Sequence, residues 1–153
     1  MIQLAAPAKA RLALRTFLVF ALCSLAVALD PTVDELKSRF ASTSIHDRPH
    51  LCLQIAKQQA GATDKFYAAN NFEKAQAALT DVVTYSELAR DYALQSHKYQ
   101  KQTEIAVREF ARKLGDLMRT LPKEDQPAVD AAIKRLQRVR DDLLAAMFPK
   151  GAK

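Results

Sequence analysis

The stretch that decides the fold is Phe72–Leu121, FEKAQAALTDVVTYSELARDYALQSHKYQKQTEIAVREFARKLGDLMRTL, which has no proline and one glycine, Gly115. Steps of three and four residues from Phe72 follow one face of a helix over seven heptads. This pattern predicts a helix of about 70 Å, if it is continuous, that packs on other helices through one seam. The seam consists of Phe72, Ala75, Leu79, Val82, Ser86, Ala89, Ala93, Ser96, Gln100, Thr103, Val107, Phe110, Leu114, Leu117 and Leu121.

The middle of this seam differs from its ends. The ends carry Phe, Leu and Val, whereas the part from Ser86 to Thr103 carries only small or polar residues. Small residues let a partner helix approach closely, and polar residues weaken a seam but can fix its register. We expect either a continuous helix or a break between Ser96 and Glu104. The small residues could be covered by the same chain or by a second copy.

Helices are expected on both sides of this stretch. A short helix should open at Asp30-Pro31, an amphipathic pattern runs over 47–69, and another runs over 125–148. Only three glycines occur, and no segment alternates like a strand. The sequence predicts an all-α antiparallel helical hairpin stack, or an elongated three- to four-helix bundle, built on one long central helix. A break near Ser96 would compact it into a four-helix bundle.

Residues 1–28 have the pattern of a secretory signal peptide. Three bases and no acid occupy 1–15, an apolar run follows over 17–29, and Ala26-Val27-Ala28 offers a cleavage site. The run is shorter than the ~20 residues that span a bilayer. We predict cleavage after Ala28. This leaves one helical domain over 29–149 and a short basic tail over 150–153, in the periplasm or secreted. An uncleaved anchor is the alternative, and it also puts the domain outside the cytoplasm.

Cleavage changes the charge and the cysteine count. Removing Lys9, Arg11 and Arg15 from the 23 bases leaves 20 against 17 acids, so the net charge falls from +6 to +3. A charge this small does not indicate nucleic-acid binding. Cys23 is also removed, so Cys52 remains alone and no intramolecular disulfide is expected. A chain of this size can be held by packing.

An aromatic stripe lies beside the small part of the seam. Tyr85, Tyr92 and Tyr99 stand seven residues apart, and Leu88 lies on the same flank. Such a stripe usually belongs to a packed core, here filling the room that small seam residues leave. The other interpretation is an exposed strip that binds a protein, peptide or glycan.

The segment IHDRPHLC contains His46, His50 and Cys52, which are metal-ligand types. Pro49 interrupts it, and no second Cys or His pair follows, although zinc sites normally draw on two pairs. The simpler interpretation is a loop with two solvated histidines and a buried cysteine.

Enzyme signatures are missing from the sequence. It has no phosphate-binding glycine loop, nucleophile elbow, paired cysteine motif or HExxH. We expect no catalysis and no cofactor. The sequence favours a non-catalytic helical scaffold or protein-interaction module of the cell envelope, which can include self-association. A protein that binds a small ligand or metal through His46, His50 and Cys52 is the alternative.

Two resemblances bear on the fold. Phe66–Leu79, FYAANNFEKAQAAL, resembles the middle of a tetratricopeptide repeat, but the long helix that follows departs from that family and no 34-residue period recurs. The whole chain, including LPKEDQPAVDAAIKRLQRVRDDLLAAMF, resembles uncharacterised signal-bearing helical proteins of soil bacteria such as Acidobacteria. This second resemblance implies an envelope protein without an assigned activity or site.

Overall fold

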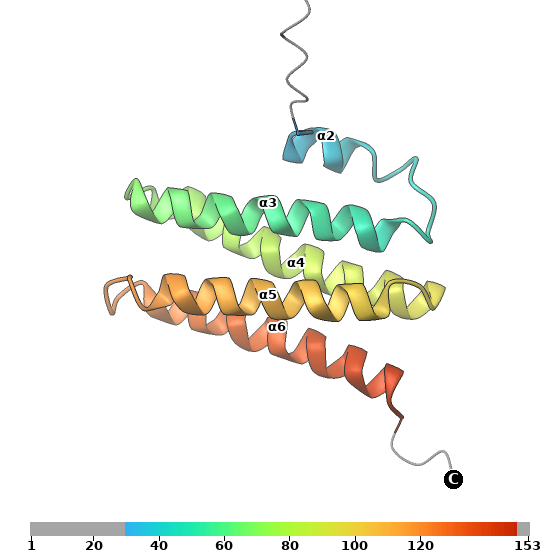
Figure 1. Cartoon of the computed structure of the whole chain (residues 1–153). Coiled ribbons are helices and arrows are strands. Elements are labelled where there is room, and N and C mark those ends of the chain that lie inside the picture. Colours follow the sequence, from blue (N-terminus) through green and yellow to red (C-terminus); the bar gives the residue numbers. More distant parts are fainter. Residues whose placement is uncertain (1–29, 150–153) are drawn as a thin grey trace, which may run out of the picture. The chain divides into compact units, whose positions relative to one another are not determined.

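The computed structural model describes residues 30–149, and the predicted signal peptide and basic tail lie outside them. Within this range the chain forms five helices and no strand (Figure 1), which confirms the all-α class. The helices are α2 (Val33–Ser38), α3 (Arg48–Ala68), α4 (Phe72–Ser96), α5 (Gln100–Met118) and α6 (Gln126–Met147).

The four longer helices form two antiparallel hairpins, α3 with α4 and α5 with α6. The hairpins stack so that α3 lies beside α5 and α4 beside α6, as Figure 1 shows. The closest packing is within each hairpin, whereas α3 and α5 meet along a slighter contact. The short helix α2 packs on α3.

The prediction of one long, continuous central helix is wrong. The chain breaks between α4 and α5, where His97 and Tyr99 take positive φ angles of 55° and 63°. Ser96 caps the break, because its Oγ accepts a hydrogen bond of 3.3 Å from the Lys98 backbone N–H. The alternative, a break between Ser96 and Glu104 that gives a four-helix bundle, is confirmed. Left-handed residues other than glycine carry an energetic cost, which the burial of both seam halves in one core offsets.

The seam itself is buried on both sides of the break. Ser86, Ala89, Ala93 and Thr103 are fully buried within the chain. Phe72 has 44% of its surface exposed, since it is the first residue of α4 at the end of the hairpin, and Ser96, Gln100 and Leu121 are half-buried. The small residues are therefore covered by the chain's own helices and not by a second copy.

The other helix boundaries follow local sequence signals. Asn70 takes a φ of 55° in the turn between α3 and α4, and the Asn71 side chain accepts a hydrogen bond of 3.2 Å from the Lys74 N–H. The first helix begins after Thr32 and not at Asp30-Pro31 as predicted, because Thr32 caps it in a capping box with Glu35.

The buried small side chains of α4 give a test of this packing. Ala89→Leu should lower the free energy of unfolding by about 1–3 kcal/mol, because the added atoms have no space in the seam. Ala77→Leu, at an exposed position of the same helix, should change it by less than about 0.5 kcal/mol. Urea unfolding followed by circular dichroism measures both, and equal stability of the two variants would contradict a closely packed seam.

Candidate functional site

Tyr92 is covered by the chain's own N-terminal segment. Its ring centroid lies 5.8 Å from that of Phe40, and the Arg48 guanidinium lies 5.3 Å from the Tyr92 ring and 5.4 Å from the Phe40 ring. Arg48 Nε also donates a hydrogen bond of 3.2 Å to the Thr43 carbonyl. This cluster, Phe40–Arg48–Tyr92, fastens the loop between α2 and α3 onto α4.

The other two tyrosines of the aromatic stripe also contact the chain itself. Tyr85 packs against a small core formed by Leu36, Leu51 and Ile55, and burial raises the pKa of its phenol. Tyr99 is the N-cap residue before α5, and its ring lies 6.3 Å from the His50 ring. Tyr85, Tyr92, Tyr99 and Leu88 are all half-buried. Tyr85 and Tyr92 thus contact α2 and its loop, whereas Tyr99 contacts α3.

A polar contact supports the same docking. Asp81 on α4 accepts hydrogen bonds from Lys37 Nζ at 2.8 Å and from Gln59 Nε2 at 2.7 Å. The hydrogen bond to Asp81 raises the pKa of Lys37. One carboxylate therefore joins α2, α3 and α4.

The structure separates the three predicted metal ligands by environment. His46 and His50 are exposed, and His50 Nε2 lies 3.3 Å from Gln54 Nε2. Cys52 is fully buried, and burial raises the pKa of its thiol from 9.0 to about 12, which disfavours the thiolate that binds metals. Across residues 30–149 no group of three His, Cys, Asp or Glu side chains could hold a metal ion.

A groove runs between α3 and α5, on a side of the hairpin stack that α2 does not cover. Its larger hollow, of about 450 Å³, has an apolar floor made by Leu53, Ala106 and Phe110. Ile105 stands at its edge with 42% of its surface exposed. The polar residues His50, Gln54, Lys57, Gln102 and Glu109 line the rest of this hollow.

A smaller hollow, of about 240 Å³, continues along the same two helices. Ala60, Leu114 and Leu117 form its apolar lining, and Asp64 and Lys113 lie at its edge. Together the two hollows are called here the α3–α5 groove. It exists because α3 and α5 pack less extensively on each other than on their hairpin partners.

Sequence reasoning did not find this groove. The only signal was Ile105, a large apolar residue outside the seam, two positions after Thr103. Nothing in the sequence alone indicates that Leu53 on α3 comes to lie near it, because that depends on which helices become neighbours.

None of the helices in the described range is long and apolar enough to cross a membrane. The chain matches no protein-family model, and comparison with curated proteins and with solved structures finds no match. The resemblances to tetratricopeptide repeats and to envelope proteins of soil bacteria therefore stay predictions.

The Phe40–Arg48–Tyr92 cluster can be tested by a pair of substitutions. Tyr92→Ala should lower the free energy of unfolding by about 1–3 kcal/mol, since it removes the ring that contacts Phe40 and Arg48. Tyr92→Phe keeps the ring and loses only a hydrogen bond of 3.5 Å from Arg48, so it should cost less than about 0.5 kcal/mol. Denaturant unfolding distinguishes them, and similar losses for both variants would show that the hydroxyl matters more than the ring.

The Cys52 pKa predicts a pH dependence of stability. Above pH 9 the unfolded chain loses the thiol proton while the native chain retains it up to about pH 12. The free energy of unfolding should therefore fall as pH rises through this window. In Cys52→Ala this contribution is gone, so its stability should decline less steeply from pH 9 upward. Parallel curves for the two proteins would contradict a raised thiol pKa.

Proposed function

We propose that the chain is a non-catalytic protein-interaction module that acts outside the cytoplasm and binds a partner protein in the α3–α5 groove. The observation that supports this most directly is Ile105, a large apolar side chain 42% exposed beside an apolar floor. Groups of this kind at a concave surface are typical of protein-binding sites. The location outside the cytoplasm rests on the signal-peptide pattern of residues 1–28.

Three of the four buried polar side chains in the described range have structural partners, which supports a non-catalytic role, whereas the Thr103 hydroxyl is buried without a hydrogen-bond partner. Glu104 is only 7% exposed, and its Oε1 accepts a hydrogen bond of 2.9 Å from Arg140 Nε on α6. The hydroxyls of Thr63 and Ser86 donate to carbonyls of their own helices at 2.8 and 2.7 Å. Glu104 thus joins α5 to α6, and the two hydroxyls are satisfied within their own helices.

Self-association through the small-residue seam is not part of this proposal. Ser86, Ala89 and Ala93 are fully buried within one chain, so they have no surface to offer a second copy. The experiment below would also detect a second copy of the chain bound in the groove.

The proposal is tested by photocrosslinking in the cells that express the protein. A photoreactive amino acid at position 105 should give a discrete adduct, because Ile105 borders the groove. The same amino acid at position 148 should not, although Phe148 is 71% exposed. The partner, identified by mass spectrometry, should bind the purified protein, and Ile105→Glu should weaken that binding at least about tenfold.

Two results would refute the groove as the binding surface. One is the same adducts from positions 105 and 148. The other is an adduct whose purified partner binds the Ile105→Glu variant as well as the original protein. Adducts of twice the chain mass would identify the partner as a second copy.

A further inference from the structure

We infer that the occupant of the α3–α5 groove is an amphipathic helix with two apolar side chains seven residues apart and acidic residues beside them. This inference rests on the proposed function and adds the class of partner. It follows from the spacing of the two hollows, from a lysine that lies between them, and from the charges around the groove.

The spacing of the hollows matches a helix. The larger hollow includes Leu53 and Phe110, and the smaller one includes Ala60 and Leu117. Each pair of corresponding residues is seven apart, so the hollows are separated by about 10 Å along α3 and α5. An α-helix presents residues i and i+7 on one face at the same separation. An extended peptide covers that distance in about three residues, which lie on alternating faces.

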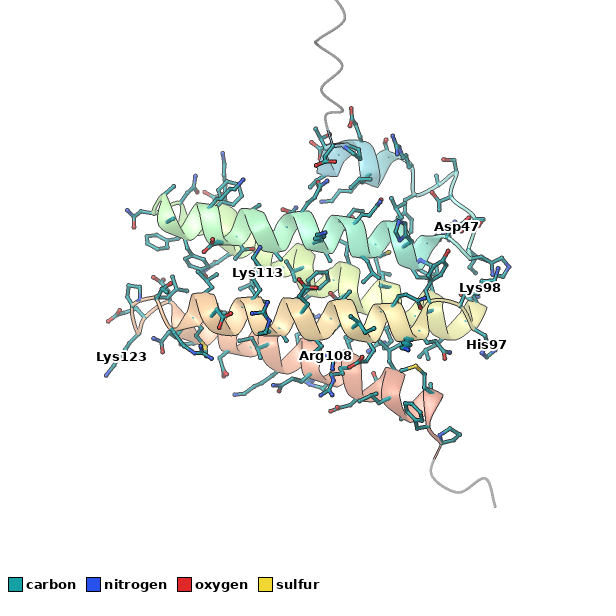
Figure 2. All side chains as sticks on the ribbon, in the orientation of Figure 1. Asp47, His97, Lys98, Arg108, Lys113 and Lys123 are labelled. Carbon is teal, nitrogen blue, oxygen red and sulfur yellow. The ribbon has the colours of Figure 1, made fainter. Side chains whose placement is uncertain are left out.

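Lys113 lies between the two hollows. Its Nζ is 3.8 Å from the place that a Cβ on Gly61 would occupy, so the side chain crosses from α5 toward α3 where α3 has no side chain. Figure 2 shows Lys113 in this position between the two helices. Its ammonium group would face the partner between the two apolar side chains, where an acid at i+3 or i+4 could reach it.

The charges around the groove favour an acidic partner. Together α3 and α5 carry seven bases and four acids. Within the described range five of these bases have no ion-pair contact, namely Arg48, Lys57, Lys65, Lys101 and Lys113, against two of the acids, Asp64 and Glu109. Asp116 is shared between Arg112 at 3.2 Å and Arg119 at 3.1 Å. In contrast, α4 carries four acids and two bases. An acidic helix is therefore attracted to the groove face and repelled from the α4 face.

The groove shape favours a helix over a lipid surface. Most apolar groups that a partner could contact are recessed between α3 and α5. Of the exposed large apolar side chains in the described range, Ile105 alone lies in the groove. A membrane is flat on this scale and would reach little beyond Ile105. Anionic vesicles are therefore included in the test as the competing occupant.

The test uses three fluorescent synthetic helical peptides of equal length and the purified protein. The first carries leucines seven residues apart and glutamates on both flanks. In the second, lysines replace the glutamates, and in the third the leucines are five residues apart. Fluorescence anisotropy should show the first peptide binding at least about tenfold more tightly than either of the others at low salt, with weaker binding at high salt.

Protein variants locate the binding on the groove. Ile105→Glu should abolish binding of the acidic peptide, and Lys113→Glu should weaken it at least about fivefold through charge reversal. Lys123→Glu is the matched control, because this exposed lysine lies in the turn between α5 and α6, away from the groove as Figure 2 shows. Circular dichroism and thermal melting should show that all three variants stay folded.

Several outcomes would overturn the inference. These are equal affinity for the acidic and lysine peptides, equal affinity for the two leucine spacings, or no binding of any peptide up to millimolar concentration. Equal effects of Lys113→Glu and Lys123→Glu would also do so. Binding to phosphatidylglycerol vesicles that Ile105→Glu abolishes would replace the helix with a lipid surface. If position 105 still crosslinks to a protein while the peptides fail, the proposed function stands and only the class of occupant is wrong.

Discussion

The close packing around the small residues of α4 is the constraint on which the rest of the structure depends. Ser86, Ala89 and Ala93 are fully buried, and their side chains are among the smallest. Helices can approach α4 closely only where such residues face them. The bulkier residues of the two seam halves, among them Val82 and Val107, then meet in one core. The fold-back at His97–Tyr99 brings the two halves together and makes this core possible.

The buried charge of Glu104 shows how the second hairpin is fixed. Its carboxylate is shared by Arg140 on α6 at 2.9 Å and Arg108 on α5 at 3.8 Å. Burying an unpaired carboxylate is costly, so this acid fixes the register in which α5 and α6 pair. Breaking such a pair by removing one partner is more damaging than replacing both, because the remaining charge stays buried.

The tight hairpins and the looser α3–α5 contact have opposite consequences. The helices within α3–α4 and α5–α6 pack extensively on each other, and α2 with its loop covers Tyr85 and Tyr92 on α4. The contact between α3 and α5 leaves two hollows and a half-exposed isoleucine. A further hollow of about 290 Å³ lies between α4 and α6, and the α3–α5 groove differs from it in having the exposed Ile105 beside it.

The sequence by itself determined the helical class, the seam and most of the turns. Asn70, Pro49 and Pro127 mark helix boundaries through local backbone preferences. The three-and-four spacing identifies residues from Ala75 to Leu117 that are buried except for the half-buried Ser96 and Gln100. These are properties of neighbouring residues along the chain, so a single sequence contains them. The small middle of the seam also indicated where a break was possible, although not that it occurs.

Only the tertiary structure decided that the chain breaks between α4 and α5, that the tyrosine stripe is covered, and that a groove forms between α3 and α5. His97 and Tyr99 carry no sequence signal for a left-handed backbone, and they adopt it because folding back buries both seam halves. Tyr92 could line a surface or a core until Phe40 and Arg48 are known to cover it. Leu53 and Ile105 are far apart in the chain and meet only because α3 lies beside α5. Which helices become neighbours is set by the packing of the whole chain, and no local pattern encodes it.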